Sequence, residues 1–238
     1  MRVRISDCSL HYEEAGTGEA LVLLHGNGED CTYFKGQIGY FSDRFRVIAL
    51  DTRGHGKSER VLAKFSINRF AEDLREVLDA LELSRVHLLG FSDGGNIAMA
   101  FALRYPERVS SLILNGANLW PSGVKLSVQA PVVLEYALSC LLAPFSREAV
   151  KKRELLGLMV TQPHVRLREL DRIHMPVMVI VGNRDMIRES HTRRIAAQIS
   201  GSRLAILRGS HFVAAEDPKA FNRAVDRFFA DKVRAGQR

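Results

Sequence analysis

A serine between glycines follows an apolar run in the first half of the chain. The run Val86–Phe91 predicts a buried strand, and Gly90-Phe91-Ser92-Asp93-Gly94-Gly95 leads from it into a helical pattern. This G-x-S-x-G pattern, placed between a strand and a helix, holds a serine hydroxyl above a sheet in a strained turn. The start of the following helix favours negative charge, because its backbone N–H dipoles point toward the serine. Ser92 is therefore the candidate nucleophile.

A neutral serine needs a base to take its proton, and that base needs an acid to orient it. His211 follows the predicted strand Leu204–Leu207, and Asp185 follows the predicted strand Val177–Val181. Ligands and catalytic groups gather at the carboxyl ends of parallel strands, so we expect both side chains to face Ser92. Asp171 and Asp217 are further acids in this part of the chain. Asp217 precedes Pro218 at a helix start and is better explained as a helix cap.

A second turn, rich in glycine, follows the predicted strand Leu21–Leu24 in His25-Gly26-Asn27-Gly28. The backbone N–H groups of Asn27 and Asp93 are expected to converge on one point above the sheet. Two such donors form an oxyanion hole, which typically contributes about 3 kcal/mol per donor to transition-state stability. The alternative is that His25-Gly26 only shapes a tight turn. His25 and His55 are expected to be structural.

Short apolar runs alternate with longer amphipathic ones, which predicts a mostly parallel α/β sheet with helices on both faces. Strands are predicted at Leu10–Glu14, Leu21–Leu24, Arg46–Leu50, Val86–Phe91, Val109–Leu114, Val177–Val181 and Leu204–Leu207. Helices are predicted at Ile67–Leu83, Ile97–Leu103, Ile195–Ile199 and Phe221–Phe229.

Residues 117–175 interrupt this alternation with prolines and helical patches, too long for a plain loop. We expect a helical cap over the open ends of the strands, inserted into a core formed by residues 1–116 and 176–238. Trp120 and Tyr136 are expected to contact substrate. The cap's apolar side chains either line a pocket, pack the cap onto the sheet, or form a homodimer contact; they are Leu119, Trp120, Val132, Val133, Tyr136, Leu138, Leu141, Leu142 and Phe145.

Composition limits the remaining possibilities. The 238 residues suffice for one large core, and 34 basic against 27 acidic residues give a net charge of +7. The basic residues are scattered without interleaved aromatics, so we expect no nucleic-acid partner. Three distant cysteines and the lack of a signal peptide or membrane span in the sequence favour a cytoplasmic protein. No metal-ligand spacing or phosphate-binding loop is present, so neither a metal nor another cofactor is expected.

Five motifs occur along the chain in a recognisable order: Leu-Leu-His-Gly-Asn-Gly, Ala-Leu-Asp-Thr-Arg-Gly-His-Gly-Lys-Ser, Gly-Phe-Ser-Asp-Gly-Gly, Val-Gly-Asn-Arg-Asp and Gly-Ser-His-Phe. With them the chain resembles the α/β-hydrolase superfamily over essentially its whole length, and its elbow is similar to that of biphenyl-hydrolase-like proteins. The resemblance implies an eight-stranded sheet with an antiparallel second strand and a cap after the sixth strand. It also implies a triad of Ser92, His211 and Asp185.

These residues predict a serine hydrolase, with small acyl esters as the expected substrates. The same triad also serves hydrolases of carbon–carbon, thioester, lactone or amide bonds, and the fold does not separate these. A ligand-binding signalling protein that kept the triad is a further alternative. A serine at the elbow argues against the haloalkane dehalogenase and epoxide hydrolase branches, which use a carboxylate there.

Asp93 is unusual, since many relatives carry Met or Gln at this position. A carboxylate opposes the negative charge that develops in the oxyanion hole, so its charge must be balanced. One interpretation is an ion pair with a nearby Arg or Lys. The other is that Asp93 binds an amino group of the substrate beside the ester carbonyl, through a charge-assisted hydrogen bond.

Overall fold

The computed structural model describes residues 1–61 and 65–236, which form an α/β sandwich around one sheet. Within this part of the chain the sheet has eight strands in the order β1-β2-β4-β3-β5-β6-β7-β8. The first two strands run antiparallel to their neighbours, and the strands from β4 to β8 are parallel. The predicted α/β-hydrolase fold, with its mostly parallel eight-stranded sheet and antiparallel second strand, is confirmed.

The strands are β1 (Arg2–Arg4), β2 (Ser9–Ala15), β3 (Glu19–Leu24), β4 (Phe45–Leu50), β5 (Val86–Phe91), β6 (Val109–Asn115), β7 (Val177–Gly182) and β8 (Arg203–Leu207). The helices are α1 (Lys35–Phe41), α2 (Ile67–Ala80), α3 (Asp93–Arg104), α4 (Leu126–Leu142), α5 (Arg147–Thr161), α6 (Glu189–Gln198), α7 (Val213–Glu216) and α8 (Pro218–Gly236). Short 3-10 helices are η1 (Cys31–Phe34), η2 (Pro106–Arg108), η3 (Pro121–Gly123) and η4 (Leu167–Arg172).

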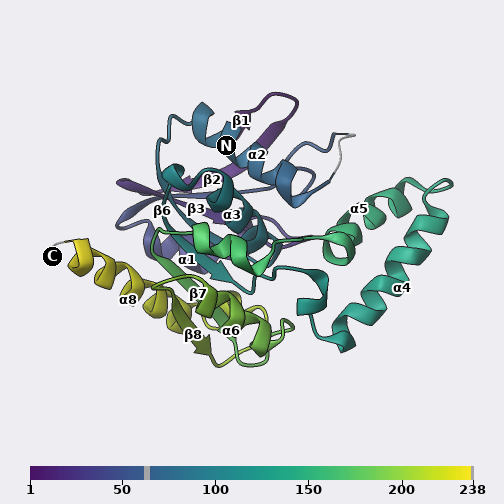
Figure 1. The fold of residues 1–238 in the computed structure, drawn as a ribbon. Helices are drawn as coiled ribbons and strands as arrows, with labels where there is room; N and C mark the ends of the chain where they lie inside the picture. Colours follow the sequence, from purple (N-terminus) through teal and green to yellow (C-terminus); the bar gives the residue numbers. More distant parts are fainter. Residues whose placement is uncertain (62–64, 237–238) are drawn as a thin grey trace.

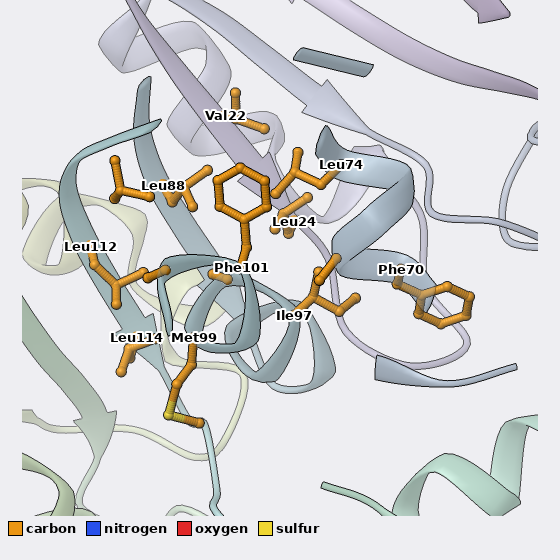
Figure 2. Close-up of a cluster of buried hydrophobic side chains, with 14 of the residues drawn as sticks. Val22, Leu24, Phe70, Leu74, Leu88, Ile97, Met99, Phe101, Leu112 and Leu114 are labelled. Atoms are coloured by element: carbon orange, nitrogen blue, oxygen red, sulfur yellow. The ribbon is translucent and has the colours of Figure 1, made fainter. Parts of the chain in front are cut away.

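The core has two halves because successive side chains of a strand point to opposite faces of the sheet. Val22 and Leu24 of β3 point to the face covered by α2 and α3, where they meet Leu88, Ile97 and other apolar side chains (Figure 2). Leu21 and Leu23 point to the other face, where α1 and α8 pack. Both faces are apolar, which explains why the central strands have continuous apolar runs rather than alternating ones.

The helical segment between β6 and β7 departs from the body of the molecule. Helices α4 and α5 form an antiparallel hairpin that projects sideways from the sheet and its covering helices (Figure 1). This is the region for which the sequence predicts a cap. The sequence left open whether the apolar side chains of this region line a pocket, pack onto the sheet or form a homodimer contact, and five of them are solvent-exposed: Val133, Leu138, Leu141, Leu142 and Phe145.

Candidate active site

Ser92 lies in the sharp turn between β5 and α3. Its φ of 54° and ψ of −119° are a strained combination for a residue with a side chain. The backbone is held there by Ser92 N–H, which donates to Asn115 O at 2.8 Å. A Cβ at Gly94 would lie 2.0 Å from Leu24 O, and one at Gly90 would lie 2.2 Å from Gly94 O. The glycines of the motif are therefore required by the close approach of helix and strand.

The other two residues of the predicted triad reach Ser92 from neighbouring loops. His211 Nε2 lies 3.0 Å from Ser92 Oγ, and His211 Nδ1 lies 2.7 Å from Asp185 Oδ1. The same carboxylate oxygen accepts from Ile187 N–H at 2.8 Å, which fixes its orientation. Both His211 and Asp185 are buried. The structure thus brings together the three residues that the sequence singled out.

The loops that carry His211 and Asp185 are locked to each other. Arg184 N–H donates to Gly209 O at 2.9 Å, and Gly209 N–H donates to Asn183 Oδ1 at 3.1 Å. A Cβ at Gly182 would lie 2.0 Å from Ser210 O, so only glycine allows the two loops to approach this closely. The separation between acid and base is therefore set by backbone contacts.

Gly116, at the carboxyl end of β6, provides the space for the imidazole. Its φ is +64°, and a Cβ there would lie 2.7 Å from His211 Cε1. Sequence reasoning did not single out this glycine. Its place directly after a predicted strand, at the edge where active sites form, is the signal that could have done so.

The two expected oxyanion donors are unused in the part of the chain that the structure describes. No backbone acceptor among residues 1–61 and 65–236 bonds the N–H of Asn27 or of Asp93. The Asn27 side chain is held in place, because its Nδ2 donates to Leu155 O of α5 at 2.7 Å. This bond ties the loop after β3 to the projecting hairpin. Two free N–H groups beside a serine hydroxyl can bind the oxyanion of a tetrahedral intermediate.

A pocket of about 190 Å³ opens beside Ser92. Its size suits a small substrate, since pockets for drug-sized ligands are about 300–1,000 Å³. Met159 of α5 extends this wall from the region for which the sequence predicts a cap. The described residues that line the pocket are Gly26, Asn27, Glu29, Phe91, Ser92, Met159, Met186, His211 and Phe212.

Glu29 is the charged side chain of this wall that sequence reasoning missed as a site residue. Its Oε2 accepts from Gly26 N–H at 3.2 Å, and no Arg or Lys among the described residues forms an ion pair with it. Burial raises the pKa of Glu29, although the Gly26 N–H and the nearby His211 act in the opposite direction. The pocket wall therefore carries an unpaired acid and, in the described lining, no lysine or arginine.

Among the described residues Asp93 has no Arg or Lys partner, although such a pair was one of the two interpretations drawn from the sequence. Its Oδ1 accepts from Asn96 Nδ2 at 3.0 Å, and the same Asn96 nitrogen donates to Asn118 Oδ1 at 3.0 Å. Its Oδ2 is buried without a partner among the described residues, and burial raises the pKa of Asp93 to about 6. The side chain is 8% exposed and is not part of the pocket wall. A contact between Asp93 and a substrate amine therefore stays a prediction.

Trp120 and Tyr136 do not line the pocket beside Ser92 either. The Trp120 ring stands edge-on to His191 of α6, with ring centroids 4.7 Å apart. Tyr136 packs toward α5, where a Cβ at Gly157 would lie 3.4 Å from the Tyr136 ring. Their proposed substrate contacts stay predictions.

Asp217 is a helix cap, as expected, because its Oδ1 accepts from Ala220 N–H at 3.0 Å at the start of α8.

His25 is buried below the site, where its Nδ1 bonds Gly26 O at 2.7 Å and its Nε2 accepts from Thr52 N–H at 3.0 Å. It braces the turn that presents Asn27, which is consistent with a structural role.

One group of side chains outside the pocket has the residue types of a metal site. The ligand atoms of His11, Cys31 and Asp51 are buried and lie within 4.8 Å of one another. The Asp51 oxygens are already bonded, one by Cys31 N–H at 2.7 Å and the other by Lys57 N–H at 2.8 Å and His11 Nδ1 at 2.9 Å. This network satisfies the carboxylate without an ion and shapes the turn after β4.

Comparison with known proteins agrees with this fold. The family model for the alpha/beta hydrolase fold matches residues 19–136. An uncharacterized protein of Mycobacterium tuberculosis is 30% identical over 266 aligned positions, which cover 90% of this chain and 76% of the relative. The chain belongs to the α/β-hydrolase family. It is accordingly a hydrolase.

Two further relatives extend over nearly the whole chain. The 3-oxoadipate enol-lactonase 2 of Acinetobacter baylyi is 27% identical over 251 positions, which cover 92% of each protein. The crystal structure of a hydrolase from Pseudomonas aeruginosa has a TM-score of 0.78 and 29% identity, with 96% of this chain and 97% of that chain covered. None of the helices described here has both the length and the apolar character needed to cross a bilayer.

Proposed function

We propose that this α/β-hydrolase cleaves carboxylic-ester bonds, in open-chain esters or lactones, through an acyl-enzyme on Ser92. The continuous hydrogen-bond chain from Ser92 through His211 to Asp185 is the observation that carries the proposal. Support for an ester bond comes from the lactonase of Acinetobacter baylyi, since a lactone is a cyclic carboxylic ester and the two chains align over 92% of their lengths.

In the proposed reaction Ser92 Oγ attacks the carbonyl carbon while His211 Nε2 takes the hydroxyl proton. Asp185 holds the imidazole with Nδ1 protonated and stabilises its positive charge. The N–H groups of Asn27 and Asp93 bind the oxyanion. His211 then gives its proton to the leaving oxygen, and water repeats the sequence to release the acid and regenerate Ser92.

The experiment is covalent labelling followed by turnover. An organophosphonate ester labels the wild-type enzyme at one site, and the Ser92→Ala variant stays unlabelled. The wild-type enzyme also releases p-nitrophenol from short-chain p-nitrophenyl esters over many turnovers. A wild-type enzyme that the phosphonate does not label contradicts the role of Ser92. Labelling without sustained release contradicts the hydrolase proposal and favours the ligand-binding alternative.

The unpaired Glu29 supports a preference for substrates without a carboxylate. Although burial raises the pKa of Glu29, its carboxylate, when ionised, repels a second carboxylate in this partly buried wall, and no Arg or Lys among the pocket's described residues offsets it. The pocket therefore favours neutral or cationic esters. This separates the chain from relatives whose substrates are carboxylates, as the name 3-oxoadipate implies.

Replacing Glu29 by Gln removes this charge and keeps an oxygen that can accept from Gly26 N–H. We expect kcat/KM for an ester that carries a carboxylate to rise about tenfold, and kcat/KM for its neutral isostere to change little. Asp30→Asn removes the same charge one residue further on, outside the pocket wall, and serves as the control. An equal effect on both esters would show that Glu29 only braces the loop.

A further inference from the structure

The outer side of α4 is apolar along its whole length and is covered by nothing in the described chain. Helix α4 packs on α5, and both project from the body of the molecule (Figure 1). Of the 17 residues of α4 only Ser139 is buried. Leu134 and Leu141 are 74% and 72% exposed, and Phe145 in the following loop is 88% exposed.

These side chains form a continuous surface, which we call the α4 stripe. It consists of Leu126, Ala130, Val133, Leu134, Ala137, Leu138, Leu141, Leu142 and Phe145. The positions recur at intervals of three and four residues, so they share one side of the helix. The charged residue of α4, Glu135, is ion-paired with Lys152 of α5.

The stripe is larger than an ordinary monomer surface tolerates. Its seven large side chains are between 42% and 88% exposed, and they leave roughly 800 Å² of apolar surface in water. The largest apolar patch of a typical monomer is about 300–600 Å². One partner of a standard protein–protein interface contributes about 800 Å².

We propose that the α4 stripe is the interface of a homodimer, in which two copies of α4 pack against each other about a two-fold axis. A two-fold axis pairs the stripe with itself, and the stripe is apolar at nearly every position. The chain carries a net charge of +7, so two copies repel each other at long range, but the stripe itself brings no like charges together.

The alanines at positions 130 and 137 leave room for close helix packing, while the leucines between them supply the ridges that interdigitate. Because the hairpin extends beyond the body, an antiparallel pairing of the two hairpins places the two sheets at opposite ends of the dimer (Figure 1).

The charges around α4 favour a second copy over a lipid surface. Amphipathic helices that bind membranes carry Lys and Arg along their polar side. Helix α4 has none within its span, and its inner side is occupied by α5. Lys152 of α5 is paired with Glu135, and Lys151 is paired with Glu148 at 3.7 Å. The other basic residues of the hairpin, Arg147 and Arg153, lie on α5 and not along α4.

Sedimentation velocity and light scattering at about 1–100 μM test the proposal. The wild-type protein is expected to have twice the monomer mass of 26.7 kDa, and the Leu134→Glu variant is expected to be monomeric with unchanged hydrolysis of short esters. Gly39→Glu introduces the same charge at an exposed position of α1, where an added Cβ meets nothing within 4 Å, and this variant is expected to stay dimeric.

A second readout uses the exposed Cys140 beside the stripe, since Cys8 and Cys31 are buried. A maleimide is expected to modify Cys140 more slowly in the wild-type dimer than in the Leu134→Glu monomer, with circular dichroism showing that both are folded. A monomeric wild type at 100 μM overturns the proposal, as does a dimer that persists with Glu at position 134. A monomeric wild type that floats with anionic phospholipid vesicles, and loses that binding in Leu134→Glu, assigns the stripe to a membrane surface instead.

Discussion

Gly116 leaves the space that the His211 ring occupies. A single methyl group added at this position is therefore expected to reduce catalysis while the protein still folds. Gly116→Ala places a Cβ 2.7 Å from His211 Cε1, whereas Gly201→Ala, at a similar φ of +69°, meets nothing within 4 Å. Both variants bear the strain of a left-handed alanine, about 1 kcal/mol. We expect kcat for an ester to fall at least a hundredfold in Gly116→Ala only, because the base is displaced from Ser92.

Urea unfolding and kcat measured on both glycine variants check this expectation. Similar losses of stability with activity lost only in Gly116→Ala support it. Equal activities would mean that His211 moves aside without losing its contact with Ser92.

Asp93 lowers the stability of the fold at neutral pH. Its pKa rises from 3.8 to about 6 on burial, so the folded state binds this proton more tightly than the unfolded state does. The cost of the buried charge is absent below pH 4, grows as the pH rises, and is complete above pH 6 at roughly 3 kcal/mol.

Asp93→Asn is therefore expected to stabilise the protein by up to that amount at pH 8 and by less at pH 5. The exposed Asp43→Asn is the control, and urea unfolding at both pH values gives the comparison. A gain that does not depend on pH would show that packing, rather than charge, is responsible.

Arg53 joins three elements at the edge of the sheet. It follows β4, is fully buried, and binds Asp73 of α2 with two bonds of 2.7 Å and Asp7 of the β1–β2 turn with bonds of 2.7 and 3.0 Å. Bidentate pairs of this kind fix the relative positions of the elements that carry them. The loop after β4 also supplies the Thr52 N–H that bonds His25, so the network supports the turn at Asn27.

Arg53→Met leaves Asp73 buried with a weaker partner, and we expect a loss of about 3–5 kcal/mol in the free energy of unfolding. The double variant Arg53→Met/Asp73→Leu is expected to recover most of this loss, because it removes the uncompensated charge. Arg69→Met, which contacts the same carboxylate from a position 30% exposed, serves as the milder comparison in urea titrations. A double variant no more stable than Arg53→Met would contradict the electrostatic explanation.

At the scale of the whole molecule, three buried histidines make the fold sensitive to acid. His25 Nε2 accepts from Thr52 N–H at 3.0 Å and His191 Nε2 accepts from Leu119 N–H at 2.9 Å, so both rings must be neutral. Burial lowers the pKa of His25 and lowers those of His55 and His191 to about 4. The unfolded chain takes up these protons near pH 6.5, so stability falls as the pH drops below that value.

Between pH 8 and pH 5 His55 and His191 are each expected to cost about 2 kcal/mol, and together they outweigh the relief at Asp93. Urea unfolding across this range measures the loss. His191→Gln keeps an oxygen that can accept from Leu119 N–H but cannot be protonated, so its stability is expected to fall by about 2 kcal/mol less. Parallel pH curves for the two proteins would exclude His191 as a contributor.

The sequence by itself determined which apolar runs form most of the strands and where Ser92, Asp185 and His211 lie relative to them, whereas the order of the strands within the sheet comes from the structure. These follow from local signals: apolar runs fix the strands, and the residue after each run must lie at the same edge of the sheet. Helix α1 and strand β1 escaped detection because both are short and lack a clear period.

Only the tertiary structure decided what surrounds the triad. Glu29 and Met159 meet in one pocket wall although 130 positions separate them, and the Asp93 side chain turns toward Asn96 rather than toward a base. The sequence also left undetermined that the α4 stripe faces outward, because an apolar helix has the same residue pattern whether it packs on its own core or on a partner. Side-chain contacts between distant segments depend on how the elements pack, and periodicity along the chain carries no information about that.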